Sequence, residues 1–468
     1  RVRISSSAPV SVICMISSIV QQSRQAFNSG ITRPLAWRKA QLETMITMLE
    51  KHQDELSAAL KVDLGRGVEE AWLYDIGFTI TEVKLMLKNL KKWTAPRKVP
   101  TPMVTKPGSS MRVPQPLGVV CVIAPWNYPV QLLLIPAAGA IAAGNAVVMK
   151  PSEVSSETSR VLAKIVPQYF TDKAVAIVEG GVQETTELLK QKFDHIFYTG
   201  NGAVGRVVMR AAAENLTPVT LELGGKSPTI VDASANIAVA ARRIAWAKYV
   251  NAGQTCVAPD YVLAHKSIAN ELVEAIRTSI TEFYGEDPHA SKDYSRVISP
   301  KHFSRLTSLI SSGKVAIGGQ SEQAERYIAP TVLVDVDQNS AVMQEEIFGP
   351  ILPVLEVGSI DEAIGFVNSR PHPLALYVFA QDNSVNEKVV AETTSGGVTV
   401  NGTIMHMTGP YLPFGGIGES GMGAYHGQSG VDVFQHLKPV LKRSTMLDAP
   451  LAYPPYTKRK FSILKKFI

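Results

Sequence analysis

A cysteine and a glutamate stand out because of their surroundings. Cys256 is one of three cysteines in the 468-residue chain, and it lies between Gly253 and Pro259 rather than inside a long apolar run. Glu222 interrupts the otherwise apolar, strand-like run 219–223, which two glycines follow. A thiolate can attack a carbonyl carbon, and a buried carboxylate can act as a general base because burial raises its pKa. The pair indicates covalent thiol catalysis; for an arbitrary pair, a core cysteine and a salt-bridged glutamate are the alternative.

Both stretches resemble signature motifs of the aldehyde dehydrogenase superfamily. The matching segments, which follow one another in the family's order, are 124–129, 150–153, 221–228, 251–259 and 345–350. Four further segments are similar to the class 3 branch, which includes the fatty aldehyde dehydrogenases: 198–201, 217–220, 412–416 and 420–427. The resemblance runs from about residue 23 to residue 455, which is nearly the whole chain.

The resemblance implies oxidation of an aldehyde to a carboxylic acid with a nicotinamide cofactor. Cys256 is expected to attack the carbonyl and form a thiohemiacetal, and Glu222 to activate the water that hydrolyses the resulting thioester. The Asn127 side-chain amide and the Cys256 backbone N–H are the expected oxyanion donors, and loss of one such donor costs about 3 kcal/mol. The implied substrates are medium- and long-chain aliphatic, aromatic or isoprenoid aldehydes. Trp72 and Trp246 match positions that line the class 3 pocket, with a core role as the alternative.

The resemblance also implies a cofactor site. Its residues are Trp126, Lys150, Glu153, Gly200, Gly205, Glu346 and Phe348. Lys150 and Glu153 are expected to hold the adenosine ribose, and Glu346 the nicotinamide ribose. The segment 200–205 reads G-x-G-x-x-G, which is typical of a pyrophosphate bound at a helix N-terminus, and we expect that helix over 206–215. A carboxylate near the ribose 2′-hydroxyl repels a 2′-phosphate, so NAD is the expected cofactor, with NADP as the alternative.

The elements that must position these residues alternate between strand and helix. Apolar runs of strand length at 117–124, 146–150, 174–178 and 195–199 alternate with helical patterns, which predicts a doubly wound, Rossmann-like α/β domain. A second α/β unit follows Gly225 and carries Cys256. We predict a disordered leader at 1–18, an NAD-binding domain formed by 19–97 and 118–222, a catalytic domain at 223–425, a small β oligomerisation element formed by 98–117 and 426–445, and a C-terminal tail at 446–468.

Composition limits the remaining function classes. The net charge of +6 is mild for this length, and the chain shows no nucleic-acid-binding motif. Three cysteines provide no disulfide framework, which favours a reducing compartment, so we expect a cytoplasmic protein. No apolar run approaches the ~20 residues of a membrane span, and no motif implies a bound metal.

Two segments suggest partners. The proline-rich stretch 96–116 predicts a projecting hairpin for a homodimer, as in class 3 proteins, with a plain linker as the alternative. The tail 457–468 interleaves basic and apolar residues and carries no acid. Such a segment can make weak peripheral contact with an anionic membrane surface, and a frayed terminus is the alternative.

Two rival functions follow from the same motifs. An acylating dehydrogenase passes its thioester to coenzyme A and needs no hydrolytic base, so Glu222 argues against it. A catalytically silent structural protein can use the same fold, since fold does not determine function. The presence of Cys256, Glu222 and Asn127 together argues against that second alternative.

Overall fold

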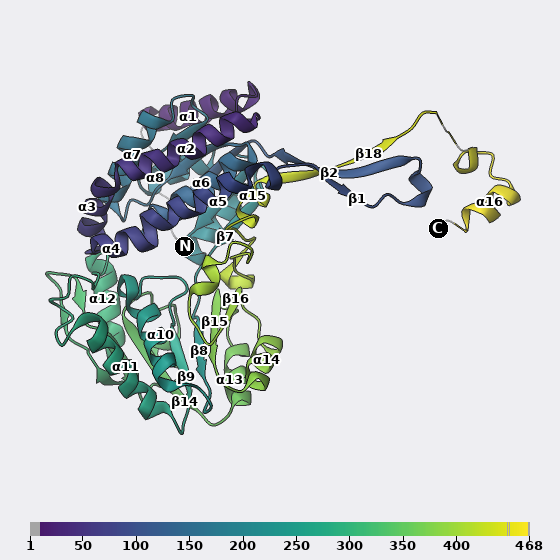
Figure 1. Ribbon diagram of the computed structural model, residues 1–468. Coiled ribbons are helices and arrows are strands. Elements are labelled where there is room, and N and C mark those ends of the chain that lie inside the picture. The colour runs from purple at the N-terminus through teal and green to yellow at the C-terminus, as the bar shows by residue number, and fades with distance from the viewer. Residues whose placement is uncertain (1–9, 447, 449, 467–468) are drawn as a thin grey trace.

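The computed structural model describes residues 10–446, 448 and 450–466, which form two α/β units and a long β arm (Figure 1). The first unit is built on a six-stranded sheet in the order β17-β7-β6-β3-β4-β5. Its strands are parallel except β17, which is antiparallel to β7. They are β3 (Val119–Ile123), β4 (Ala146–Lys150), β5 (Val175–Ile177), β6 (His195–Thr199), β7 (Val219–Glu222) and β17 (Gly421–Met422).

Helices cover both faces of this sheet because its strands are apolar on both sides. Val119 and Cys121 of β3 pack with helices α1, α8 and α9, whereas Val120 and Val122 pack with α2, α5, α6 and α7. Successive strand residues point to opposite faces, so a wholly apolar strand must be covered twice. The helices are α1 (Val10–Asn28), α2 (Leu35–Lys51), α5 (Gly77–Trp93), α6 (Gln131–Ala143), α7 (Ser156–Tyr169), α8 (Val182–Leu189) and α9 (Gly202–Ala213). Between α2 and α5 lie α3 (Gln53–Leu64), α4 (Val68–Ala71) and the π-helical turn η1 (Trp72–Ile76).

The second unit is built on a seven-stranded sheet in the order β10-β13-β14-β9-β8-β15-β16. Only the β10–β13 pair is antiparallel. The strands are β8 (Pro228–Val231), β9 (Tyr261–His265), β10 (Lys314–Ile317), β13 (Thr331–Val334), β14 (Ile351–Val357), β15 (Ala375–Phe379) and β16 (Gly397–Val400). Helices α10 (Ile237–Tyr249) and α11 (Ala269–Tyr284) cover one face. Helices α12 (Pro300–Leu309), α13 (Ile360–Asn368) and α14 (Asn383–Glu392) cover the other. A small hairpin of β11 (Ser321–Glu322) and β12 (Tyr327–Ile328) lies outside the sheet.

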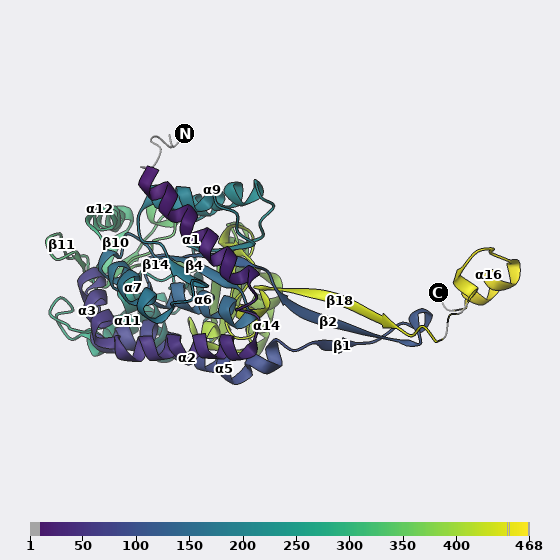
Figure 2. The ribbon, with the colours of Figure 1, turned by 90° about the horizontal axis from the view of Figure 1, so that it is seen from above.

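The arm is a three-stranded antiparallel sheet that projects from the body (Figures 1 and 2). It is formed by β1 (Arg97–Val99), β2 (Gly108–Pro116) and β18 (Gln435–Arg443). The second half of the arm begins later than the predicted residue 426, because the short helix α15 (Ser429–Asp432) packs on α6 first. That packing is close: a Cβ added at Gly139 of α6 would lie 2.1 Å from the Gly430 carbonyl oxygen.

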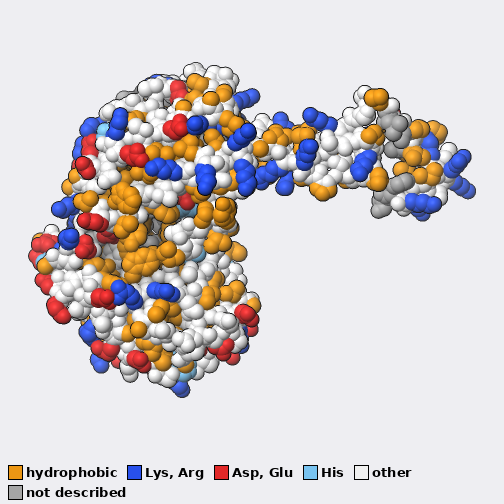
Figure 3. Space-filling model, viewed as in Figure 1, with side chains coloured by type: hydrophobic (Ala, Val, Ile, Leu, Met, Phe, Trp, Pro, Cys, Tyr) orange, Lys and Arg blue, Asp and Glu red, His pale blue; other side chains and the backbone are white. Residues whose placement is uncertain are grey.

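The C-terminal helix α16 (Lys458–Leu464) lies beyond the far end of the arm (Figure 2). Figure 3 shows Lys and Arg side chains distributed along the arm and around this helix. The three arm strands contain no acidic residue. Within the part of the chain that the structure describes, no helix has the length and apolarity needed to cross a membrane.

The predicted disordered leader differs from the structure over residues 10–18. Residues 1–9 lie outside the described part of the chain, but α1 begins at Val10. Val12, Ile16 and Val20 are four residues apart and pack against the first sheet. The apolar residues of this segment therefore form one stripe of an amphipathic helix.

The predicted end of the catalytic domain at 425 also differs from the structure. Strand β17 pairs with β7 of the first sheet, with Gly421 opposite Glu222. The Leu223 N–H donates to the Ser420 carbonyl at 3.0 Å, and the Tyr425 ring packs on Phe197 of β6 with centroids 5.1 Å apart. The chain thus returns to the first unit by about residue 420. Apart from these differences, the domain division stays a prediction.

Replacing Ile16 by Ala should test the docking of α1. Ile16 is 0% exposed, so Ile16→Ala is expected to lower the free energy of unfolding by about 2–5 kcal/mol through lost burial and a cavity. The neighbouring Met15 is 47% exposed, and Met15→Ala serves as the control with a change of at most about 0.5 kcal/mol. Urea unfolding measures both, and equal small effects would contradict a docked helix.

Candidate active site

The three predicted catalytic residues come from different elements that meet where the two units join. Glu222 ends β7, and Asn127 lies between β3 and α6 at the carboxyl edge of the first sheet. Cys256 follows the 3-10 turn Val250–Gly253 after α10 of the second unit. Hydrogen bonds tie the units together at this point. Asn127 Nδ2 donates to the Gln254 carbonyl at 3.1 Å, and the Tyr128 hydroxyl lies 2.8 Å from Thr255 Oγ1.

The loop that carries Cys256 reverses direction through left-handed backbone. Asn251, Ala252 and Gly253 have φ values of 54°, 50° and 73°, in a region that residues other than glycine rarely adopt. A Cβ at Gly253 would lie 2.2 Å from the Gly349 carbonyl oxygen. Gly253 is therefore required both by its φ and by the close approach of the 345–350 loop.

Side chains hold this loop from several directions. Gln254 Nε2 donates to the Asn251 carbonyl at 2.9 Å and to the Arg296 carbonyl at 3.0 Å. The Asn251 N–H donates to Glu70 Oε1 at 2.7 Å, and Glu70 Oε2 accepts from the Ser295 hydroxyl at 2.8 Å. These bonds fix the backbone immediately before the thiol.

Cys256 is partly buried, and its thiol is free rather than part of a disulfide. Burial, and then the charges of Glu346 and Glu222, raise its pKa to about 12, while the backbone amides of residues 256 and 257 oppose that rise. The thiol is therefore protonated at neutral pH, and attack on a carbonyl requires a group that takes its proton. Glu346 and Glu222 raise this pKa because their negative charges disfavour a thiolate.

Glu222 has the surroundings of a general base. Its side chain is 2% exposed, and neither carboxylate oxygen has a hydrogen-bond partner among the described residues. Burial raises its pKa well above the ordinary value. Its main-chain carbonyl accepts from the Gly200 N–H at 3.0 Å, which anchors the end of β7 beside β6.

The predicted cofactor residues lie on both sides of this site. Trp126 packs perpendicular to Phe348 with ring centroids 5.3 Å apart. The Glu346 carboxylate lies against Gly224, where an added Cβ would be 2.0 Å from Oε2. Burial, followed by the charge of Asp260, raises the pKa of Glu346 to about 8.

The adenosine-side residues lie at the ends of β4 and β6. Buried Lys150 donates from Nζ to the Pro151 carbonyl at 2.7 Å and lies 3.5 Å from Glu153 Oε2. A Cβ at Gly200 would be 2.3 Å from the Tyr198 hydroxyl. Backbone without a side chain at this position leaves room for close approach of a phosphate, which fits a dinucleotide.

The helix after Gly200 begins earlier than predicted. It starts at Gly202 rather than Arg206, because the Asn201 side chain caps it by accepting from the Val204 N–H at 3.0 Å. Gly205 is therefore inside the helix, where it packs against Leu223. The G-x-G-x-x-G spacing is real, but only its first glycine lies before the helix.

The two candidate pocket tryptophans have different surroundings. Trp72 begins the π-helical turn and is 44% exposed. Trp246 of α10 donates from Nε1 to the Tyr74 hydroxyl at 3.0 Å, and it packs on the apolar cluster that Cys256 also contacts. Trp246 is thus partly buried in the second unit, whereas Trp72 lies at the surface.

Sequence reasoning missed Arg66, Asp75 and Glu70. Arg66 and Asp75 form a wholly buried ion pair, and Glu70 holds Asn251. Arg66 lies between α3 and α4, whereas Glu70 and Asp75 lie in helical segments, where a charge is ordinarily read as part of a solvated face. The signal that could have found them is the clustering of charges in the short interval 66–75 between two apolar helices.

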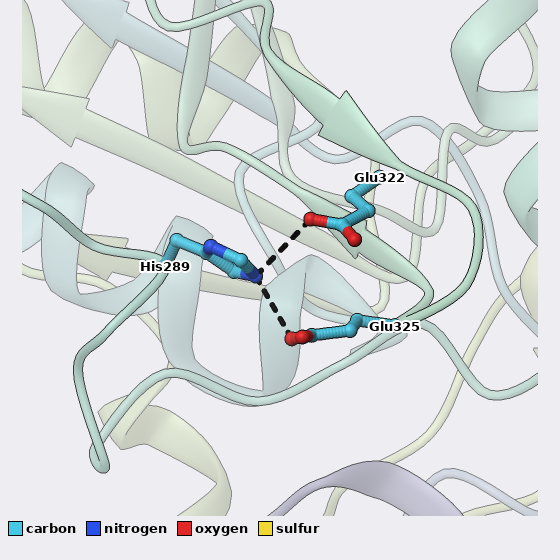
Figure 4. A group of neighbouring side chains, drawn as sticks. All are labelled: His289, Glu322 and Glu325. Carbon is cyan, nitrogen blue, oxygen red and sulfur yellow. Dashed lines mark hydrogen bonds and ion pairs between the residues drawn. The ribbon is translucent and has the colours of Figure 1, made fainter.

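Figure 4 shows another cluster, His289, Glu322 and Glu325, on the second unit. Among the described residues it is the one set of His, Cys, Asp and Glu side chains whose atoms gather closely enough for a cation. His289 Nε2 lies 2.8 Å from Glu325 and 3.7 Å from Glu322, and Arg296 also pairs with Glu325 at 3.7 Å. The cluster is accounted for by surface ion pairing, and we assign it no metal.

Glu222→Gln should stabilise the folded protein in a pH-dependent way. The folded state keeps a proton on Glu222 that the unfolded chain releases above its ordinary pKa of 4.5, so wild-type stability falls as pH rises through this interval. Each pH unit contributes about 1.4 kcal/mol until the raised pKa is reached. Denaturant unfolding at pH 5 and pH 8 should therefore show a larger gain for the variant at pH 8; a difference independent of pH would contradict the raised pKa.

Comparison with known proteins identifies the family of the chain. Residues 14–440 match the family model described as Aldehyde dehydrogenase family. The chain is 50% identical to Aldehyde dehydrogenase family 3 member A2 of Mus musculus, over 96% of this chain and 93% of that protein. It is 49% identical to Aldehyde dehydrogenase, dimeric NADP-preferring, of Canis lupus familiaris, over 94% of this chain and 98% of that protein.

The fold is likewise that of a solved relative. The substrate-bound state of Staphylococcus aureus AldH superimposes with a TM-score of 0.95 and 45% identity, covering 97% of this chain and 99% of that one. The predicted family and α/β fold class are confirmed. The chain belongs to the aldehyde dehydrogenase family, and it is an NAD(P)-dependent oxidoreductase that oxidises aldehydes to carboxylic acids.

Proposed function

We propose that this enzyme acts on medium- and long-chain aliphatic, aromatic or isoprenoid aldehydes through the thiol of Cys256. The observation that carries the proposal is the meeting of Cys256, Glu222 and Asn127 at the junction of the units. Apolar side chains support the substrate class: Val68, Trp72 and Leu73 are exposed on α4 and η1. Figure 3 shows hydrophobic side chains gathered on the face where the units meet.

The reaction begins at the thiol. Cys256 loses its proton, and its thiolate attacks the aldehyde carbon to form a tetrahedral thiohemiacetal. The developing oxyanion is stabilised by the Asn127 amide and the Cys256 backbone N–H, donors that are in place before the reaction. A nicotinamide dinucleotide held by Lys150, Glu153 and Glu346 would supply the hydride acceptor that oxidation of the Cys256 thiohemiacetal to a thioester requires.

Hydrolysis of the thioester is assigned to Glu222. Its unpaired, buried carboxylate takes a proton from water, and the resulting hydroxide attacks the thioester and frees the carboxylic acid and the thiol. Burial raises the pKa of Glu222 above that of an ordinary carboxyl, which makes its carboxylate a stronger proton acceptor for this step. Tyr128, Gln254 and Glu70 act on the loop that presents the sulfur.

A steady-state assay tests the substrate class and the nucleophile together. The purified protein is given NAD and aldehydes from propanal to hexadecanal, with farnesal and benzaldehyde. We expect kcat/KM to rise with chain length, because apolar area is buried on binding, and Cys256→Ser to lower turnover by about 10³-fold or more.

The same assay separates the rival functions. NADH formed without coenzyme A supports hydrolysis, whereas strict dependence on coenzyme A would favour the acylating alternative. A protein that binds cofactor but oxidises no aldehyde would favour the silent structural alternative.

We also infer that Glu153 sets the balance between NAD and NADP. Its carboxylate is half-exposed beside the buried Lys150 ammonium, where the adenosine ribose is expected. A carboxylate there repels a 2′-phosphate, so NAD is favoured. One relative at 49% identity is named NADP-preferring, so use of both cofactors is expected.

Glu153→Gln should shift that balance. Removing the negative charge is expected to raise kcat/KM for NADP about 10-fold, or ~1.4 kcal/mol, while kcat/KM for NAD falls or stays level. The matched control is Glu157→Gln. It removes the charge of a nearby glutamate that pairs with Arg160 instead of Lys150. If the NADP/NAD ratio moved equally in both variants, a specific contact by Glu153 would be excluded.

We further propose that the arm joins two copies into a homodimer. The same relative is named dimeric, and the arm exposes Met103 and Leu441 to solvent. Symmetric pairing of such surfaces is the common form of assembly. Peripheral membrane contact through the basic and apolar α16 stays a prediction from its composition.

A further inference from the structure

Arg66 and Asp75 form a buried ion pair in the first unit. Both side chains are 0% exposed, and Arg66 Nη1 lies 3.0 Å from Asp75 Oδ2. Arg66 follows α3, and Asp75 lies in the turn η1. Burying two charges is costly unless their remaining hydrogen-bonding atoms find partners, so the partners of this pair indicate what the pair does.

Those partners all lie on the segment 127–131. Arg66 Nη2 donates to the Asn127 carbonyl at 2.6 Å, and Asp75 Oδ1 accepts from the Gln131 N–H at 2.5 Å. The Arg66 guanidinium also lies 4.7 Å from the centroid of the Tyr128 ring. One ion pair therefore holds the start, the middle and the end of the segment that carries Asn127.

The same segment faces the thiol loop on its other side. The Asn127 carbonyl also accepts from Asn251 Nδ2 at 3.0 Å, and the Tyr128 hydroxyl bonds Thr255, the residue before Cys256. Asn127 Nδ2 gives one hydrogen to the Gln254 carbonyl. An amide nitrogen carries two hydrogens, so the second remains for a substrate oxygen.

We propose that Arg66 and Asp75 are positioning residues that set the direction of the Asn127 amide toward the oxyanion formed on Cys256. This inference rests on the proposed function, in which Asn127 is an oxyanion donor. Arg66 Nε has no partner among the described residues, whereas Nη2 donates to the Asn127 carbonyl at 2.6 Å. The guanidinium is thus oriented toward the Asn127 segment at the expense of one of its own hydrogen bonds. This orientation favours a positioning role over a purely structural one.

Two reactions of the same thiol distinguish positioning from general damage. Acylation of Cys256 by p-nitrophenyl acetate passes through an oxyanion: sulfur bonds to the carbonyl carbon, and p-nitrophenolate leaves. Alkylation by iodoacetamide forms a bond from sulfur to a saturated carbon with loss of iodide, and no oxyanion develops. Both rates are measured on the full chain without cofactor.

Arg66→Met is expected to slow acylation by about 10- to 100-fold, because loss of one oxyanion donor costs about 10²–10³-fold and a misdirected donor costs less. Alkylation should change by less than about 3-fold, since the thiol itself is untouched. Arg66→Lys should restore part of the acylation rate, because the charge beside Asp75 returns without the guanidinium fork. Equal slowing of both reactions would overturn the proposal.

Arg326→Met is the matched control. The Arg326 guanidinium also donates to main-chain carbonyls, those of Val62, Asp63 and Ile298, but it makes no bond to segment 127–131. Its acylation rate should be unchanged. If acylation slowed as much as in Arg66→Met, positioning by Arg66 would be refuted.

A double variant separates this inference from the proposed function. Asn127→Ala alone should slow acylation, and adding Arg66→Met should bring no further loss, because both act on one donor. Additive losses would overturn positioning by Arg66 alone. No effect of Asn127→Ala would instead overturn the role of Asn127 itself and the inference with it.

Folding is checked separately. Arg66→Met leaves the Asp75 carboxylate buried without its partner, so the double variant Arg66→Met/Asp75→Asn, which carries neither charge, is measured in parallel. It should keep the wild-type alkylation rate and show the same loss of acylation. Wild-type acylation in this folded variant would refute the proposal.

Discussion

The proposed nucleophile is carried by one α/β unit, while its base and its oxyanion donor are carried by the other. Everything in the site depends on joining them in register. The backbone from Asn251 to Gly253 achieves this by three successive residues with positive φ, an arrangement that costs free energy unless surrounding contacts enforce it. The enforcing contacts come from both units: Glu70 and Asn127 from the first, and Arg296 from the second.

Burial at this junction disfavours the charged forms of the thiol and carboxyl groups that lie there. It raises the pKa values of Cys256, Glu222 and Glu346, and these are the groups to which the proposed reaction assigns proton exchange or cofactor binding. The same burial destabilises the fold when those groups ionise. Catalytic readiness and stability are therefore opposed here, as is common where active sites are strained or desolvated.

The C-terminal part of the chain ties the units and the arm to each other. Strand β17 returns to the edge of β7 directly opposite Glu222, so the proposed base lies on a strand that is paired on both sides rather than at an open edge. Residues 425–434 then pack on α5 and α6 before the chain leaves along β18. Because β18 pairs with β2 over its full length, the arm is continuous with the body that carries Asn127.

The sequence by itself determined the elements whose evidence is local. Strands β4 and β6 have the bounds that their apolar runs predict, because apolar pattern and length are properties of neighbouring residues. The family could likewise be identified from the sequence, since its motifs are short contiguous segments of the chain.

Only the tertiary structure decided which distant groups meet. Arg66 and Asn127 are 61 residues apart, and Glu70 and Asn251 are 181 apart. The docking of α1 and the pairing of β17 are of the same kind. A charge or an apolar run looks the same in sequence whether it faces water or a partner, and only the folded chain supplies that partner.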